Sequence, residues 1–304
     1  MKQRTIKDWI IAVRPWSFPA SVIPVLVTLG YLYYIQPTTG YFNWLSGWLA
    51  FPMLVLLHGG GNLVSDYFDH VKGVDLPGSL NGVNHIHSGK FQPKTILHYG
   101  WMLLAVGALI GIVILLFTWK NYHSYEAVWI GVAAIALPLL YPWMKGHALG
   151  DVDILLCFAM LPSVGICYIM TGDYHWEMLL YCLSFGLLTV SILHSNNTRD
   201  IENDCRAGLR TLCGIIGRRT SQYIYLVELA TPYVLVCIFV ACEVWPLWTL
   251  LIGLTLPLAV RNARIMLSGE QHPAFPALDK FSAQLQMAFG LLTALGFALG
   301  VWLC

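Results

Sequence analysis

Long apolar runs alternate with short polar segments along the whole chain. A helix needs about 20 mostly apolar residues to cross the hydrocarbon core of a bilayer. This pattern predicts an all-α, polytopic integral membrane protein with about nine transmembrane helices, organised as one domain over residues 1–304. The nine predicted spans are residues 17–36, 43–63, 98–118, 126–143, 152–171, 177–196, 222–241, 245–267 and 282–303.

The distribution of Lys and Arg indicates the orientation. If the N-terminus lies in the cytoplasm, all of the 17 basic residues except Lys120 fall in cytoplasmic segments, as the positive-inside rule requires. The connections at 70–97 and 197–221, on this same face, are long and polar. Because functional residues concentrate on elaborate loops, we expect a site facing the cytoplasm in a cell inner membrane. Residues 5–13 are expected to form a short amphipathic helix on that surface.

Composition agrees with a membrane protein. Hydrophobic residues make up 57% of the chain and charged residues 11%, against roughly 25% charged residues in soluble proteins. The net charge of +1 gives no basic surface for nucleic acid. None of the eight cysteines forms a C-x-x-C pair, so we interpret them as small buried side chains.

Two clusters of aspartate stand at the cytoplasmic ends of the second and sixth predicted spans. In the first, Asn62, Asp66 and Asp69 follow one another at i, i+4 and i+7, which places them on one helical face. In the second, Asp200 and Asp204 are again four residues apart, with Asn196 or Asn197 one turn earlier. The repeated pattern suggests one composite site between the two helices.

Ionised carboxylates at membrane depth are costly and normally face a cavity, a partner or an ion. Two facing clusters would repel each other unless a cation lay between them. Oxygen-only ligands suit Mg²⁺, which typically binds one or two carboxylates together with substrate phosphate oxygens. The four aspartates are therefore predicted to bind Mg²⁺ and a diphosphate. The alternative is that they are solvated helix-end carboxylates paired with Lys72, Arg199 or Arg206.

Several further residues on the same face could complete such a site. Predicted contacts to the diphosphate are Asn62, Lys72, Asn197, Arg206, Arg210, Lys145 and Arg14; the alternative for the basic ones is ordinary positive-inside charge. Tyr141 could stabilise a developing carbocation through its ring, or it could be an interfacial aromatic. Asp151 is predicted near the acceptor, with a helix cap as the alternative. His58, His194 and Glu228 are interpreted mainly as packed, hydrogen-bonded residues.

These residues resemble a known family. The segments NLVSDYFDHVKGVD at 62–75 and NNTRDIENDCRAGLRTL at 196–212 are similar to the paired aspartate motifs of the UbiA superfamily of intramembrane aromatic prenyltransferases. The segments RPWSFPASVIPVLVTLG at 14–30 and PAFPALDKFSAQLQMAFGLL at 273–292 resemble its menaquinone branch. The resemblance covers nearly the whole chain.

The resemblance implies that Asn62, Asp66, Asp69, Asp200 and Asp204 bind Mg²⁺-diphosphate, with Lys72 and Arg210 as phosphate contacts. It implies transfer of a polyprenyl group to 1,4-dihydroxy-2-naphthoate, giving demethylmenaquinone. The implied partners are a polyprenyl diphosphate, an aromatic acceptor and membrane lipid, with no obligate protein partner. Other acceptors within the family are 4-hydroxybenzoate, homogentisate and haem. A different class, the cation-coupled transporter, usually carries its ionisable residues near the bilayer midplane, whereas these clusters lie at one face.

Overall fold

Helices account for nearly all of the regular structure in the part of the chain that is described. The computed structural model describes residues 4–72, 86, 88–206 and 208–303, apart from the side chains of Thr39, Asp69, Lys72, Leu139 and Pro142. Its helices are α1 (Ile6–Ala12), α2 (Pro19–Thr39), α3 (Trp44–Lys72), α4 (Pro93–Tyr122), α5 (Glu126–Lys145), α6 (Gly150–Leu155), α7 (Leu161–Thr171), α8 (Met178–Tyr181), α9 (Leu183–Arg199), α10 (Ile201–Arg206), α11 (Leu212–Ile216), α12 (Arg218–Ala241), α13 (Leu256–Ser268) and α14 (Leu278–Trp302).

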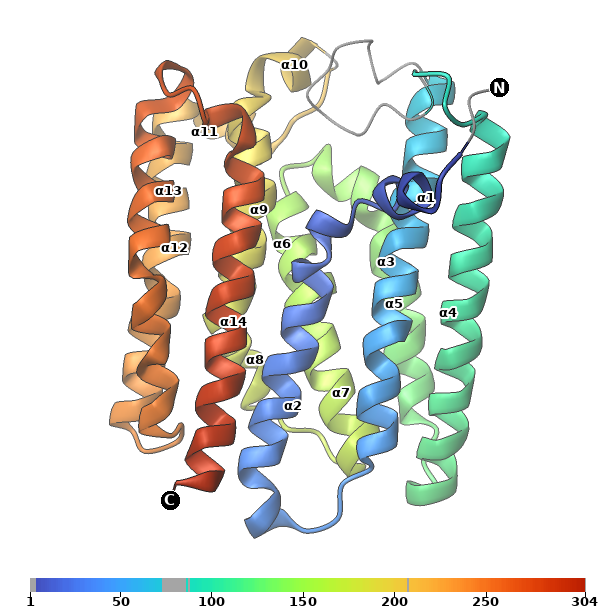
Figure 1. The fold of residues 1–304 in the computed structure, drawn as a ribbon, viewed down its shortest axis with the longest axis vertical. Coiled ribbons are helices and arrows are strands. Elements are labelled where there is room, and N and C mark those ends of the chain that lie inside the picture. The colour runs from blue at the N-terminus through green and yellow to red at the C-terminus, as the bar shows by residue number, and fades with distance from the viewer. Residues whose placement is uncertain (1–3, 73–85, 87, 207, 304) are drawn as a thin grey trace.

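The long helices run side by side, with the N-terminus at the upper end of the bundle and the C-terminus at the lower end (Figure 1). Within the described residues, seven helical stretches are long and apolar enough to cross a membrane. The remaining predicted spans, 126–143 and 177–196, coincide with α5 and with α8–α9, which do not meet the same criterion. The prediction of a polytopic all-α protein is confirmed, whereas the count of nine is not.

Glycines allow α14 to pack closely against its neighbours. A Cβ atom on Gly296 would lie 2.6 Å from the Cα atom of Thr249, and one on Gly290 would lie 2.2 Å from Ile23 Cγ2. Only residues without a side chain permit backbones to approach so closely, which is the usual basis of helix association in membranes. This packing joins α14 to α2 and to the 3₁₀ helix Leu247–Thr255 that leads into α13.

Several helices are interrupted. A π-helical turn at Leu156–Met160 separates α6 from α7, and Cys182 separates α8 from α9. The helix α9 ends at Arg199, and its C-cap residue Asp200 has φ −96° and ψ 11°. Because a break changes the direction in which later side chains point, these positions decide which residues face the bundle interior.

The predicted amphipathic segment at 5–13 forms the helix α1 (Ile6–Ala12), which lies in front of the upper part of the bundle (Figure 1). A capping box starts it, in which the Thr5 backbone N–H and hydroxyl donate to Asp8 Oδ2 at 2.9 and 2.8 Å. Asp8 also pairs with Lys90, and the Trp9 ring packs edge-on against Phe91 with 4.7 Å between ring centroids. The helix is thereby held to the segment that precedes α4.

Candidate functional site

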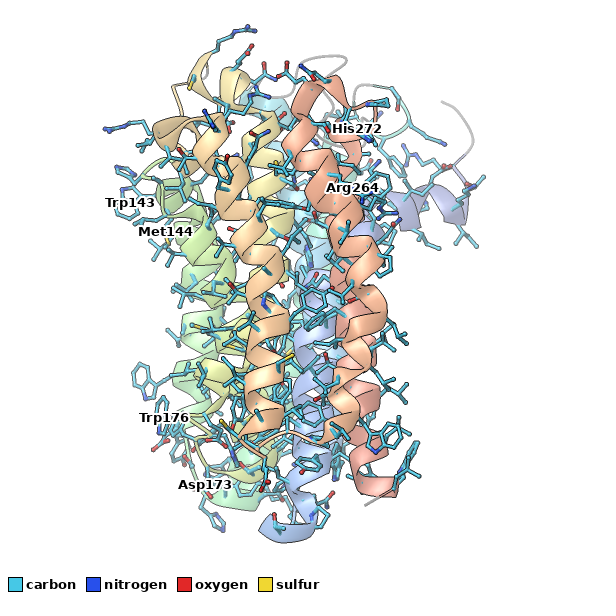
Figure 2. All side chains as sticks on the ribbon, turned by 90° about the vertical axis from the view of Figure 1, so that its left-hand side faces the viewer. Trp143, Met144, Asp173, Trp176, Arg264 and His272 are labelled. Atoms are coloured by element: carbon cyan, nitrogen blue, oxygen red, sulfur yellow. The ribbon has the colours of Figure 1, made fainter. Side chains whose placement is uncertain are left out.

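The two aspartate clusters lie at the same end of the bundle, where α3 finishes and α9 passes into α10 (Figure 1). Trp143, Met144, Arg264 and His272 lie toward this upper end, while Asp173 and Trp176 lie at the opposite end (Figure 2). Asp66 belongs to the last turns of α3. Asp200 caps α9 and Asp204 lies on α10, yet the Asp204 N–H still donates to the Asp200 carbonyl at 2.8 Å. The predicted i, i+4 spacing therefore survives the break in the helix.

Asp66 forms an ion pair with Arg14. The Asp66 side chain is 13% exposed and that of Arg14 27%, so the pair is largely shielded from solvent. Arg14 has φ 57° and ψ 59°, a left-handed conformation that non-glycine residues seldom adopt. Such backbone strain persists only where surrounding contacts enforce it, and the contact with Asp66 is one of these.

Asn62 ties the same two segments together. Its side-chain amide donates to the Val13 carbonyl oxygen and to Ser17 Oγ, both at 3.2 Å. The connection between α1 and α2 is therefore fastened to α3 at Asn62 and again, one turn later, at Asp66. In this structure the Asn62 amide nitrogen is engaged by the protein itself.

Asp200 is held by its neighbour in sequence. Arg199 Nε and Nη2 donate to the two Asp200 carboxylate oxygens at 2.9 and 2.8 Å, a paired geometry that is stronger than a single contact. Arg199 Nη1 also donates to the Pro276 carbonyl at 2.9 Å and lies 3.8 Å from Asp279 Oδ1. One guanidinium group thus links the end of α9 to the start of α14.

Asp204 faces Lys145 from the end of α5, with 3.9 Å between Oδ1 and Nζ. Its other oxygen, Oδ2, is buried and has no hydrogen-bond partner. Burial raises the pKa of the Asp204 carboxyl; the Lys145 ammonium opposes this rise, and the Asp200 carboxylate adds to it. A buried carboxylate oxygen without a partner is costly, and this one could accept a ligand.

The three described aspartates of the clusters therefore share one feature, which is a basic partner: Arg14 for Asp66, Arg199 for Asp200 and Lys145 for Asp204. The alternative prediction, carboxylates paired with nearby cations, describes part of what is seen, and of the three observed partners only Arg199 is among the basic residues it names. Paired charges of this kind can also exchange partners, because a cation could bind the carboxylates while the basic groups contact a phosphate.

The other predicted contacts occupy varied environments. Arg206 is 77% exposed and pairs with Glu202 at 3.7 Å. Arg210 forms a single backbone bridge with His147, which brings the chain after α10 against the α5–α6 connection, and Gly146, His147, Arg210 and Ile215 line a small pocket there. Tyr141 lies one turn before Lys145 on α5 and is half-buried.

Asn197 is buried in the last turn of α9, at 4% exposure. Asp69 and Lys72 lie on the last turns of α3, and their side chains are outside the described part of the chain. The predicted roles of these three residues stay predictions.

Asp151 has neighbours that the sequence did not connect with it. His194 Nδ1 lies 3.0 Å from Asp151 Oδ2 and 3.2 Å from Glu228 Oε1. These three residues come from α6, α9 and α12. No spacing in the sequence connects these three residues; the signal that they share is their rarity as polar residues within apolar spans.

The fold and these charges define a multi-pass membrane protein with an acidic site, compensated by basic groups, at one end of the bundle. A model of the UbiA prenyltransferase family matches residues 21–283. A curated relative, the UbiA prenyltransferase domain-containing protein 1 homolog of Drosophila melanogaster, is 32% identical over 292 residues, which are 94% of this chain and 78% of the relative. The chain belongs to the UbiA prenyltransferase family.

Solved structures share the fold. The apo structure of a UbiA homolog from Aeropyrum pernix K1 has a TM-score of 0.67 at 17% identity, covering 92% of this chain and 98% of that one. A UbiA homolog from Archaeoglobus fulgidus, solved bound to DMAPP and Mg²⁺, has a TM-score of 0.57 at 14% identity, covering 97% and 98%. The predicted family is therefore confirmed, and the menaquinone branch stays a prediction.

Proposed function

We propose that this protein transfers a polyprenyl group from an allylic polyprenyl diphosphate to an aromatic acceptor, with Mg²⁺ as cofactor. The proposed acceptor is 1,4-dihydroxy-2-naphthoate, and the proposed site faces the cytoplasm of a cell inner membrane. The observation that carries the proposal is the pairing of Asp66, Asp200 and Asp204 with Arg14, Arg199 and Lys145 at one end of the bundle. The structure of the Archaeoglobus fulgidus homolog with DMAPP and Mg²⁺ supports the same ligand class.

The residues present fit Mg²⁺. Asp66, Asp200 and Asp204 supply carboxylate oxygens, the donors that Mg²⁺ prefers, and the unpartnered Asp204 Oδ2 is an oxygen that a cation would satisfy. Asp69 is the fourth proposed ligand. When bound, Mg²⁺ would supply positive charge to the leaving diphosphate.

The protein's own groups would do the remaining work. Arg14 and Lys145, freed from their carboxylates, would hold diphosphate oxygens and stabilise the charge that develops as the allylic C–O bond breaks. Arg199 would stay with Asp200, because its hydrogen bond to Pro276 fixes it in place. Tyr141, one turn from Lys145, would present its ring to the allylic cation. The apolar helix walls would exclude water from that cation.

The test uses the full chain in lipid nanodiscs with Mg²⁺, a long-chain prenyl diphosphate and a panel of acceptors: 1,4-dihydroxy-2-naphthoate, 4-hydroxybenzoate, homogentisate and haem. With the first acceptor, mass spectrometry should detect demethylmenaquinol, or the demethylmenaquinone that forms from it by oxidation in air. D66N and D200N should abolish Mg²⁺-dependent turnover, while D173N, at the opposite end of the bundle (Figure 2), should keep it. Wild-type rates in both D66N and D200N would sink the proposal, and a product from another acceptor would replace the naphthoate.

A further inference from the structure

A second group of ionisable side chains lies deeper in the bundle than the aspartate clusters. His194 is fully buried, and the side chains of Asp151 and Glu228 are 11% and 8% exposed. All three ligand-type atoms lie within 4.8 Å of one another. His194 precedes Asp200 by six residues on α9, which corresponds to about 9 Å along a helix. The backbone just before Asp151 packs against Lys145, since a Cβ atom on Gly150 would lie 3.5 Å from Lys145 Cα.

The hydrogen bonds around His194 indicate where its protons lie. The Thr198 hydroxyl donates to the His194 carbonyl at 2.8 Å, and the Ser221 hydroxyl lies against Thr198 Oγ1 and donates to Cys213 Sγ at 3.2 Å. His194 Nε2 lies 2.8 Å from Ser221 Oγ and 3.1 Å from the Ser221 carbonyl oxygen, and because a carbonyl oxygen only accepts, Nε2 is assigned as a donor. Nδ1 faces two carboxyl groups; when both of these are ionised, Nδ1 donates as well and the ring is an imidazolium.

In that state the cluster holds two carboxylates against one imidazolium, a net charge of −1 inside an apolar bundle. Buried Asp151 Oδ1 and Glu228 Oε2 have no hydrogen-bond partner. In the described part of the chain, Cys213 of α11 and Tyr225 of α12 also face the cluster and are ordinarily neutral, and the charged Arg261 of α13 lies near Tyr225. A buried excess negative charge with orphaned oxygens is suited to taking up a proton.

We infer that Asp151, held by His194 and Glu228, accepts the hydroxyl proton of the aromatic acceptor during prenyl transfer. The inference rests on the proposed function. Asp151 is the most exposed of the three side chains and follows Gly150, which packs against Lys145, so it is the member placed to touch the acceptor. His194 and Glu228 are positioning residues: His194 occupies Asp151 Oδ2 and leaves Oδ1 to the acceptor, and Glu228 supplies the second negative charge.

The proton and electron balance closes for 1,4-dihydroxy-2-naphthoate. The acceptor O–H bond breaks, its proton goes to Asp151 Oδ1, and its electron pair enters the ring. The ring carbon that bears the carboxylate bonds to the prenyl C1, whose C–O pair leaves with the diphosphate. The carboxylate then departs as CO₂, its C–C electron pair restores the aromatic ring, and the proton returns from Asp151 to the acceptor oxygen.

The test compares wild type with D151N, E228Q and a matched control, D153N, as full chains in nanodiscs. Asp153 lies on the same helix, is also buried and is bonded by Cys157 at 3.6 Å instead of by His194. Values of kcat, and KM for each substrate, are measured from pH 6 to 9.5. General bases typically contribute about 10²- to 10⁴-fold, so kcat of D151N should fall by that factor at neutral pH, and kcat of E228Q by about tenfold.

The pH profile separates chemistry from folding damage. Both variants should recover roughly tenfold per pH unit as the acceptor hydroxyl ionises by itself, since phenolic groups titrate near pH 10. The KM for prenyl diphosphate should stay within about twofold, and D153N should keep the wild-type profile. A pH-independent loss with a raised KM for prenyl diphosphate would overturn the inference, because it would indicate a structural role.

Metal analysis supplies a second decisive readout. One equivalent of a transition metal in wild type that disappears in E228Q would also overturn the inference, because the cluster would then be a metal site. Metal-free wild type with the expected profile supports it. If wild type forms no prenylated product from any acceptor, the proposed function fails, and this inference fails with it. If wild type is active and D151N has the same activity, only this inference is overturned.

Discussion

Replacing Lys145 with Met should weaken the productive binding of prenyl diphosphate without weakening that of Mg²⁺. Lys145 Nζ lies 3.9 Å from Asp204 Oδ1, and the two side chains are 27% and 13% exposed. Once Asp204 binds a cation, the Lys145 charge repels that cation and attracts the diphosphate. Met keeps the apolar stem, which Lys uses to reach the site, and removes only the charge.

The magnitude follows from the burial of the pair. Two unit charges 4 Å apart interact by about 4 kcal/mol at an effective dielectric constant near 20, and the partial exposure of Lys145 reduces this value. A hydrogen bond to a charged group contributes about 1.5–3 kcal/mol. Because each 1.4 kcal/mol is about a factor of ten, kcat/KM for prenyl diphosphate should fall roughly 10- to 150-fold.

The assay measures steady-state rates, with product detected by mass spectrometry. Prenyl diphosphate is varied at saturating Mg²⁺, and Mg²⁺ is then varied at saturating prenyl diphosphate. K94M, at the exposed start of α4, is the control. R206M should show a smaller loss than K145M, because Arg206 is 77% exposed and paired with Glu202. A rise in half-saturating Mg²⁺ that matches the rise in KM for diphosphate would refute the reasoning, since Lys145 would then act only by arranging Asp204.

Two further predictions concern stability. G296A should lower the melting temperature in detergent, because the new Cβ would lie 2.6 Å from Thr249 Cα and overpacking costs about 1–3 kcal/mol. The control G253A, whose new Cβ would have nothing within 4 Å, should leave the melting temperature unchanged or raise it. The second concerns α1: the hydrogen bond and charge of Lys90, with the bonds from Thr5, lower the pKa of Asp8 from 3.8 to about 2. The docked form therefore keeps this stabilisation above pH 4 and loses it as the pH falls through about 2. Limited proteolysis at the N-terminus should accelerate over that interval in wild type and should already be fast at neutral pH in D8N.

The sequence predicts where the helices lie because lipid contact requires apolar side chains, and it predicts their ends less well. The apolar run at 98–118 belongs to a helix that continues from Pro93 to Tyr122, since helical hydrogen bonds extend into the polar interface. Hydrophobicity also could not reveal that residues 247–255 form a 3₁₀ helix or that Cys182 interrupts the span at 177–196. Those features depend on backbone geometry and on tertiary packing.

The candidate site could likewise be predicted from the sequence only in part. Spacing alone placed Asp66 on the Asn62 face of α3, and positive-inside charge placed Arg14 at the same end. The contact between Arg14 and Asp66 joins residues 52 positions apart, and no local pattern encodes which basic residue meets which carboxylate. The same holds for His194, which reaches Asp151 across 43 residues.

The π-helical turn at Leu156–Met160 has a consequence for how this helix can vary. One residue inserted into an α-helix turns everything beyond it by about 100°, so α6 and α7 present different faces although they form one rod. The upper half directs Asp151 toward α9 and α12, while the lower half buries every residue from Ser163 to Met170. Substitutions in the lower half can then adjust packing without redirecting Asp151. Deleting a single residue from the turn would instead rotate α6 against α7. The contact between Asp151 and His194 would then be lost, although every residue of the site would still be present in the sequence.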